Sequence, residues 1–340
     1  MSQGEVITNS SEVLFIYEAR LCNPNGDPDD ENKPRIDRRT HINLVSDVRL
    51  KRFFRNFIAE HYGEHHLWVT TVDGKHVRPE ERLEKLDKGK NPEAVLRCID
   101  ARLFGALVPI GKGQKARGKS YSYTGPVQFS WGYSLHPVEI VDSSTITSVF
   151  KGREETEVKR KSGEEEERKP EAEEEVEAYG TIGKDWRLYY SLIAFYGVIN
   201  PARARGTKAR KSDLEVLDNL LYKSVLIDAT TRTKIGHQPH LYLRVEYDDG
   251  EFLLGDLRKF IGVEFSKDAP IRSFQDLTLT FGKLTETITG VKDKINKLYV
   301  YVSEELEGRY KLYESLERGL GPEKLKRIPY KAVEPSLFQL

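Results

Sequence analysis

The 340-residue sequence predicts an α+β fold, with strands joined partly as hairpins rather than as a doubly wound parallel sheet. Short apolar runs bounded by turn residues, which are typical of strands, alternate with stretches whose apolar residues recur at helical spacing. In the second half of the chain, two such runs are separated only by a short turn, as in a hairpin. A chain of this length buries a sizeable core, as one large domain or as two ordinary ones.

The first half of the chain begins with a predicted strand and a predicted amphipathic helix. Val13–Ala19 is a short apolar run that ends at a turn-rich cluster. Ser46 is a suitable N-cap for a helix that runs to about Tyr62, with an apolar face and a cationic face. A second helix is expected over Pro92–Phe104. Residues 125–142 predict a strand whose buried face carries Val127, Phe129, Trp131, Tyr133 and Leu135.

The second half continues the alternation of helices and strands. Trp186–Asn200 is aromatic and apolar, either a strand or a buried helix. Ser212 is a candidate N-cap for a helix that ends near Ile227. His240–Tyr247 and Glu251–Leu254 predict a hairpin around an Asp-Gly turn. The remaining predicted elements are strands at Asp276–Phe281 and Leu298–Ser303 and a helix at Glu304–Glu317.

Charged side chains make up 32% of the chain, yet the net charge is zero, so local clusters rather than total charge indicate its partners. Residues 151–178 contain almost nothing to bury, and we expect a mobile acidic insertion there. Cys22 and Cys98 form neither a CxxC pair nor a disulfide framework. The sequence lacks a signal-like or membrane-spanning apolar run, which predicts a cytoplasmic protein with no membrane partner. The single Met and the abundant Lys, Arg and Glu suggest a heat-adapted host.

Three cationic stretches predict nucleic-acid binding. In residues 23–55, a turn-rich loop precedes three arginines and a basic helix face. Residues 111–124 and 202–211 contain four and five cations, respectively, and no acid. Such donors bind backbone phosphates without reading sequence, and neighbouring aromatic rings can stack on unpaired bases. The alternative for each cluster is an ordinary solvated loop, or a charged helix surface in the first stretch.

Residues 113–120, GQKARGKS, match the nucleotide-binding pattern G-x-x-x-x-G-K-[ST]. That motif requires a helix N-terminus immediately after it, so that backbone amides and the helix dipole hold the phosphates. The residues that follow, YSYTGP, are poorly suited to begin a long helix. We therefore favour a cationic loop over an ATP or GTP site.

Carboxylates and histidines provide two further candidate sites. Asp27 and Asp29 lie in a loop beside cations, where carboxylates can hold Mg²⁺ for phosphodiester cleavage, although the loop residues are equally typical of turns and caps. His61 and His65 have the spacing of a helical metal pair, but no third ligand is evident. His237 and His240 are more typical of packing or phosphate contact. We expect no metal site and no cofactor.

The chain resembles the backbone subunit of type I CRISPR surveillance complexes (Cascade), the Cas seven family, in its I-B and I-C branch. The matching stretches are NPNGDPD at 23–29, PRID at 34–37, VSDVRLKRFFRN at 45–56, DARLFG at 100–105, TGPVQFSWGYSLHPVEI at 124–140, FYGVIN at 195–200 and TTRTKIGHQPHLYLRVEY at 230–247. They are spread in order over about two-thirds of the chain.

The resemblance implies a single RRM-like (ferredoxin-like) palm domain over 1–340. Inserted helical fingers would span about 60–123, and a thumb β-hairpin about 141–185, with the acidic segment 151–178 as its mobile tip. It implies a non-catalytic protein that stacks in copies along the CRISPR guide RNA (crRNA) as a helical filament. The guide would be displayed for pairing with target DNA in antiviral defence, beside the capping, large and small Cascade subunits.

The resemblance and the charge pattern together give a set of candidate RNA contacts and one alternative activity. Related subunits of type III complexes cut target RNA with an Asp after the first strand, so a metal-dependent ribonuclease using Asp27 or Asp29 is the alternative. The candidate contacts are Arg35, Arg38, Arg39, Lys51, Arg52, Arg55, Lys112, Lys115, Arg117, Lys119, Tyr121, Tyr123, Gln128, Lys184, Trp186, Arg203, Arg205, Lys208, Arg232 and Lys234.

Overall fold

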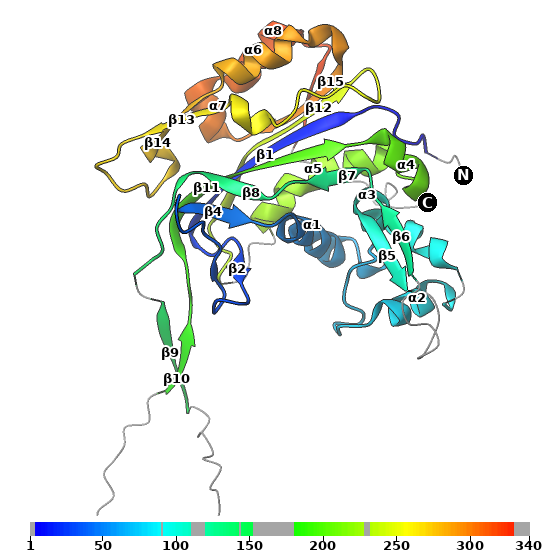
Figure 1. Ribbon diagram of the computed structural model, residues 1–340, viewed down its shortest axis with the longest axis horizontal. Coiled ribbons are helices and arrows are strands. Elements are labelled where there is room, and N and C mark those ends of the chain that lie inside the picture. The colour runs from blue at the N-terminus through cyan, green and yellow to red at the C-terminus, as the bar shows by residue number, and fades with distance from the viewer. Residues whose placement is uncertain are drawn as a thin grey trace, which may run out of the picture.

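A large mixed sheet forms the centre of the computed structural model, which describes residues 4–89, 91–109, 120–142, 144–151, 180–227 and 232–329 (Figure 1). Its strands, in spatial order, are β16 (Leu325–Arg327), β15 (Ile295–Val302), β12 (His237–Tyr247), β1 (Ser11–Cys22), β11 (Leu188–Ile199), β8 (Gly132–Pro137) and β4 (Ile42–Val45). A further strand, β7 (Val127–Phe129), also pairs with β11. Every pair in this sheet is antiparallel except β15–β16.

Strand β1 lies inside the sheet, and both neighbours, β11 and β12, pair along most of its length. Its residues 13–17 are fully buried on both faces. The predicted strand Val13–Ala19 is therefore confirmed and is longer than its apolar run. Trp186–Asn200, whose sequence fits either a strand or a buried helix, contains strand β11.

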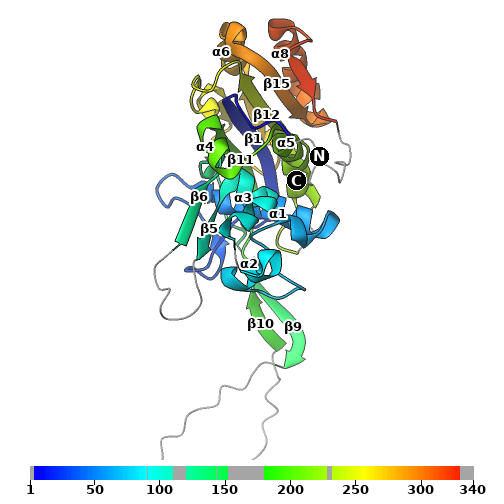
Figure 2. The same cartoon turned by 90° about the vertical axis from the view of Figure 1, so that its right-hand side faces the viewer.

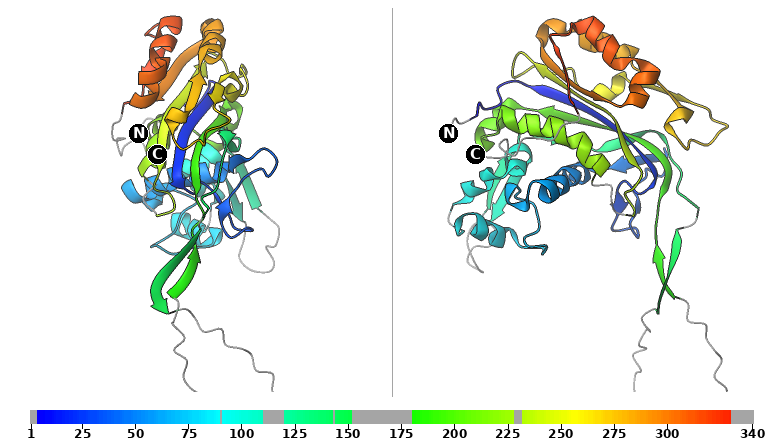
Figure 3. Two further views of the ribbon diagram at one scale, coloured as in Figure 1. Left: turned by 90° about the vertical axis from the view of Figure 1, so that its left-hand side faces the viewer. Right: turned by 180° about the vertical axis from the view of Figure 1, so that it is seen from behind.

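Helices cover one face of the sheet, and the C-terminal elements cover the other (Figures 1 and 3). Alternate residues of β1 contribute to two separate cores, as the two-residue period of a strand requires. The first core contains α1 (Asp47–His61) and α5 (Lys211–Ile227). The second core is formed by α6 (Gly282–Gly290), α7 (Glu304–Tyr310), α8 (Leu312–Leu320) and the hairpin of β13 (Gly262–Phe265) and β14 (Leu277–Thr280).

Two projections leave the sheet on the side that carries α1, so the molecule has the outline of an arch (Figures 1 and 2). One is the ribbon of β9 (Thr145–Lys151) and β10 (Gly180–Lys184). The other, called here the α2–β6 projection, has its own small core. It contains α2 (Pro79–Asp87), α3 (Ile99–Phe104), β5 (Gly105–Pro109) and β6 (Ser120–Thr124), and α4 (Pro201–Thr207) packs against it. The acidic segment 151–178 lies outside the described residues, apart from Lys151.

The structure also contains short elements that connect these parts. A small hairpin pairs β2 (Gly26–Asp27) with β3 (Lys33–Pro34) in the loop after β1. Among the described residues, the 3-10 helices are Glu64–His66, Pro92–Arg97, Leu257–Phe260, Phe274–Asp276 and Lys292–Lys294. Within the ranges that the structure describes, no helix is long and apolar enough to cross a membrane.

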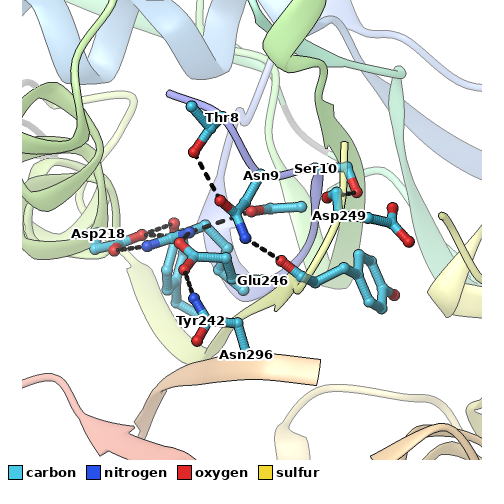
Figure 4. A network of polar contacts seen from close by, with 11 residues as sticks. Thr8, Asn9, Ser10, Asp218, Tyr242, Glu246, Asp249 and Asn296 are labelled. Carbon is cyan, nitrogen blue, oxygen red and sulfur yellow. Dashed lines mark hydrogen bonds and ion pairs between the residues drawn. The ribbon is translucent and has the colours of Figure 1, made fainter. Parts of the chain in front are cut away.

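Buried ion pairs fasten α5 to its neighbours. Arg102 of α3 pairs with Asp213 at 2.7 Å, which joins the α2–β6 projection to α5. Figure 4 shows a second network, in which Asp218 of α5 accepts hydrogen bonds from Tyr242 at 2.6 Å and from Arg244 at 2.7 and 2.8 Å. The guanidinium of Arg244 also forms an ion pair with Glu246 at 2.9 Å. Helix α5 is therefore bound to the sheet by charge as well as by apolar packing.

Several predicted elements differ from the structure, each for a local reason. The helix expected over Pro92–Phe104 is divided at Cys98, whose ψ of 130° is extended. The helix expected over Glu304–Glu317 is divided at Lys311, which has a left-handed φ of 50°. Glu251–Leu254 is not a strand, because the Glu12 carboxylate binds the backbone amides of residues 254 and 255, and β15 pairs with β12 instead.

The strand predicted over residues 125–142 is also divided, between β7 and β8. The burial pattern changes parity at this break, so Gly132, Ser134 and His136 are buried in β8. Trp131, expected in the buried face, is 47% exposed instead.

Candidate nucleic-acid interface

The loop between β1 and α1 is a compact structure built from its turn residues. The β2–β3 hairpin closes through hydrogen bonds to the Asp27 carbonyl, and Asn32 adopts a left-handed φ of 58° that asparagine tolerates. The Asn25 side-chain oxygen accepts hydrogen bonds from both the amide and the hydroxyl of Ser46, each at 2.9 Å. Because Ser46 also caps α1, as predicted, the loop and the helix start are held together.

Asp27 takes part in this turn rather than standing free. Its carboxylate pairs with Arg35 at 3.1 Å and accepts the amide of Asp29 at 3.2 Å. In the part of the chain that the structure describes, no group of three or more His, Cys, Asp or Glu residues could hold a metal ion. The contacts of Asp27 therefore support the turn interpretation of the acidic loop.

Asp185, which directly follows β10, organises the cations at the base of the β9–β10 ribbon. Its carboxylate accepts hydrogen bonds from Arg187 at 2.8 and 3.1 Å and from Arg232 at 3.0 Å. Burial raises the pKa of Asp185, but the hydrogen bonds and charges of the two arginines together hold the pKa below its ordinary value. Asp185 thus stays ionised and joins the ribbon base to the loop before β12.

Trp186 lies beside two lysines in the same region. Lys33 Nζ is 4.9 Å and Lys184 Nζ 5.8 Å from its ring centroid, within the range of cation–π attraction. Lys234 Nζ donates to the carbonyl of Asn23 and so ties the loop before β12 to the loop after β1. Together with Arg187 and Arg232, these residues form the ribbon-base cluster: Lys33, Lys184, Trp186, Arg187, Arg232 and Lys234.

Two hollows border the ribbon-base cluster. One, of about 410 Å³, lies between the loop and the ribbon base, and Arg49, Lys184, Trp186 and Lys234 are among its lining residues. The other, of about 790 Å³, is lined by residues of the loop after β1, including Arg38, and by Val138, Glu139, Ile140 and Asp142. The structure thus brings together Lys184, Trp186, Arg232 and Lys234 from the predicted set. Lys33, Arg49 and Arg187 also lie at this site. They were not among the predicted contacts, and the only indication of them in the sequence is that each is a cation close to a predicted residue.

The expectation that three cations project from α1 is wrong for two of them. Lys51 is 7% exposed and pairs with Asp47 at 2.9 Å, and Arg55 pairs with the buried Asp100 at 2.8 Å. Both also lie over the ring of Phe104, because α3 packs against this face of α1. Only Arg52 is exposed as expected.

Other predicted residues lie on the α2–β6 projection and beside it, at the other end of the arch. Tyr121 is exposed on β6, and Tyr123 is partly buried against the projection's core. Arg203, Arg205 and Lys208 belong to α4 and the residue after it, and Lys208 pairs with Glu93 at 2.9 Å. The structure therefore groups the predicted cations at both ends of the arch rather than in one patch.

Gln128 and the arginines of the loop complete the predicted set. The Gln128 side-chain amide donates to the carbonyls of Phe104 and Gly125, so it joins β7 to the projection. Arg38 and Arg39 are exposed at a turn that Asp37 stabilises by accepting the Arg39 amide.

Of the nucleotide-loop pattern GQKARGKS, only its last residue is described, and Ser120 begins strand β6. Residues 120–124 pair antiparallel with β5, so a strand follows the pattern where a phosphate loop requires a helix. The predicted contacts Lys112, Lys115, Arg117 and Lys119 lie outside the described residues.

The buried histidines pack against other side chains. His237 lies edge-on to Tyr17 and Phe53, and burial lowers its pKa to about 3. His240 stacks on Phe274 with the ring centroids 4.2 Å apart. These contacts confirm the interpretation of this pair as packing residues.

Comparison with known proteins assigns the family. Residues 9–282 match the family described as CRISPR-associated protein Cas7. The CRISPR-associated protein Cas7 of Haloferax volcanii is 30% identical over 322 residues, which cover 88% of each protein. Two solved structures, titled "CRISPR RNA-guided surveillance complex" and "CRISPR RNA-guided surveillance complex, pre-nicking", share 12% identity with TM-scores of 0.46 and 0.49. They align with 97% of this chain and with 96% and 98% of theirs. The chain therefore belongs to the Cas7 family of CRISPR-associated proteins.

Proposed function

We propose that this protein binds crRNA as the backbone subunit of a CRISPR surveillance complex. The observation that carries the proposal is the ribbon-base cluster, in which Lys33 and Lys184 lie over the Trp186 ring and Arg232 is held by the adjacent Asp185. Cations bind the phosphates of any sequence, and an indole ring stacks on unpaired bases. Membership of the Cas7 family supports the same function.

The arrangement of the elements supports an RRM-like palm with two insertions. Strands β12, β1, β11 and β8 lie in that order, and α1 and α5 cover one face. A β-α-β-β-α-β chain with the first and last strands adjacent in the sheet is the ferredoxin-like pattern. In this proposal the α2–β6 projection is the fingers and the β9–β10 ribbon is the thumb.

The RNA would lie across the side of the arch that carries α1, held at the ribbon base and at the α2–β6 projection. Further copies would bind along the same guide as a helical filament, and other Cascade subunits would complete the complex. Because the protein holds phosphates and leaves base edges free, target DNA would be recognised by pairing with the guide.

The alternative, metal-dependent RNA cleavage by Asp27 or Asp29, has less support, because Asp27 is already bound to Arg35 and to a backbone amide. The two functions differ in one assay. Incubation of the loaded protein with complementary RNA and Mg²⁺ should leave the RNA intact. If wild type cleaves the RNA and Asp27→Ala does not, the ribonuclease alternative would replace the proposal.

Binding of single-stranded RNA at several salt concentrations tests the proposal. The triple variant Lys33→Gln, Lys184→Gln, Arg232→Gln should bind more weakly, and the dependence of log Kd on log salt should flatten by about 0.7 for each phosphate that the protein no longer neutralises. A matched control replaces three lysines of the C-terminal layer: Lys267→Gln, Lys283→Gln, Lys292→Gln. Equal affinity of the two triple variants would reject the ribbon-base cluster as the binding site.

A further inference from the structure

Trp131 is an exposed aromatic residue on a rigid support. It lies between β7 and β8, and its side chain is turned to solvent although its neighbour Phe129 is buried. The buried Arg258 donates to the Trp131 carbonyl at 2.8 Å and is itself held by Asp256 at 2.7 and 2.8 Å. The backbone that carries the ring is therefore fixed from within the protein.

The residues on either side of Trp131 restrict the backbone further. The Ser130 amide donates to the carbonyl of Tyr196 in β11 at 2.9 Å. A Cβ atom at Gly132 would lie 2.4 Å from the Phe195 ring of β11. Any residue other than glycine would therefore require the backbone or the ring to move. A large aromatic side chain is thus presented to solvent on a fixed backbone.

A cation lies beside the Trp131 ring. The guanidinium carbon of Arg35 is 5.8 Å from the ring centroid, and Asp27 holds the same guanidinium at 3.1 Å. Two residues earlier in the chain, Lys33 lies over Trp186 in the same way. The short segment 33–35 is therefore flanked by two tryptophan–cation pairs.

We propose that Trp131, with Arg35 beside it, stacks on an unpaired nucleobase of the bound RNA. The inference rests on the proposed function and adds a second stacking position to that of Trp186. An aromatic face provides contact with a base, and the adjacent guanidinium provides contact with its phosphate. Two such pairs along one segment fit a linear polyanion better than a single protein anchor, so RNA is favoured over a second copy of the chain as the occupant.

Tryptophan fluorescence and affinity measurements on the full chain test this inference, with a short oligoadenylate as the probe. The three tryptophans differ in exposure, with Trp68 at 6% and Trp131 at 47%. Stacking should quench the emission of Trp131, and the quenched component should be absent in Trp131→Phe. At constant salt, Trp131→Ala should weaken binding about 5- to 150-fold, whereas Trp131→Phe should retain most of the affinity.

The salt dependence separates stacking from charge. Trp131→Ala should leave the slope of log Kd against log salt unchanged, because the indole has no charge. Leu253→Ala, which truncates an exposed apolar side chain in the segment after β12, is the matched control and should bind as wild type does.

The contrary outcomes distinguish this inference from the proposed function. Unchanged RNA affinity and unchanged fluorescence quenching in the Trp131 variants, with binding weakened in the ribbon-base triple variant, would overturn this inference alone. A decrease in self-association in Trp131→Ala, without any change in RNA affinity, would overturn it by assigning the residue to an interface between copies. No binding of RNA by the wild-type protein would overturn both proposals.

Discussion

Replacing Asp213 by Ala should destabilise the protein strongly, because the change leaves the guanidinium of Arg102 buried without its counter-ion. Both side chains are 1% exposed, and two hydrogen bonds of 2.7 and 2.9 Å join them. Arg102 also donates to the carbonyls of Leu96 and Arg97. These two bonds would keep the charge in the interior after the carboxylate has gone.

The magnitude follows from the burial of the pair. Removing one partner of a buried ion pair costs about 3–5 kcal/mol of unfolding free energy. An unfolding entropy of about 2.1 cal/mol/K per residue gives about 0.7 kcal/mol/K for a chain of this length. The same loss therefore lowers Tm by about 4–7 °C. Asp213 also accepts the Arg210 amide at 2.9 Å at the start of α5, so the upper part of this range is expected.

Scanning calorimetry of Asp213→Ala, of a double variant that removes both charges and of a control measures this effect. The double variant Arg102→Met, Asp213→Leu should unfold closer to wild type than Asp213→Ala does, because no charge is left unpaired. Glu93→Ala, which breaks the exposed pair with Lys208, is the control and should cost less than about 1 kcal/mol. A Tm of Asp213→Ala within about 1 °C of wild type would refute the reasoning, since the pair would then contribute no more than an exposed one.

Three further predictions concern the sheet and the loop. Gly236→Ala should cost at least about 1–3 kcal/mol, because φ is +117° and the new Cβ would lie 2.1 Å from a carbonyl oxygen of β1. Urea unfolding measures this loss, and a variant as stable as wild type would contradict the prediction. The folded pKa values of His136 and His237, about 4 and about 3, lie below the ordinary 6.5, so the unfolded chain binds more protons below pH 6.5. The free energy of unfolding should therefore be highest above pH 6.5. As the pH falls from 6.5 to the folded pKa, each histidine should lower it by about 1.4 kcal/mol per pH unit. When the free energy of unfolding is measured from pH 7.5 to 5, it should fall less steeply in His237→Phe than in wild type, because one of the two histidines is gone. The same slope in both proteins would contradict the argument. Asn25→Ala should cost about 1–3 kcal/mol in chemical denaturation, because two donors of Ser46 lose their acceptor; a neutral result would mean that the loop is not anchored there.

Elements whose signal is local were predictable from the sequence. The apolar run of β1 and the Ser46 cap of α1 lie where the pattern placed them, and the strand expected over Leu298–Ser303 is found as β15, which begins earlier, at Ile295. The breaks at Cys98 and Lys311 were not predictable, because neither residue is a helix breaker by composition. They depend on how the short helices on each side pack.

At the candidate site, too, features with a local sequence signal were predictable, and contacts set by the fold were not. The turn chemistry of the loop after β1 was evident from its residues, and the resemblance together with the pattern of cations and aromatic residues indicated Lys184, Trp186, Arg232 and Lys234. Asp185, which fixes two arginines at the ribbon base, gave no signal because its partners are set by the fold. The same holds for Arg55, whose acidic partner Asp100 is 45 residues away in the chain.

Trp131 is the clearest case of a pattern that failed for a physical reason. Its alternation with Phe129 predicted a buried position, but the break between β7 and β8 changes the parity of the side chains. The alternation of apolar residues in the sequence does not reveal that break, although Gly132, which lies directly against the Phe195 ring of β11, stands next to it.

The central claim, that the ribbon-base cluster binds guide RNA, is tested most directly by the RNA that accompanies the protein. Wild type, the ribbon-base triple variant and the C-terminal lysine control would each be purified from cells that transcribe a CRISPR array. The bound nucleic acid would then be extracted and sized. We predict a short RNA of uniform length with wild type and with the control, and little or none with the Lys33, Lys184, Arg232 variant. Wild-type protein free of RNA, or a triple variant carrying as much RNA as wild type, would contradict the account.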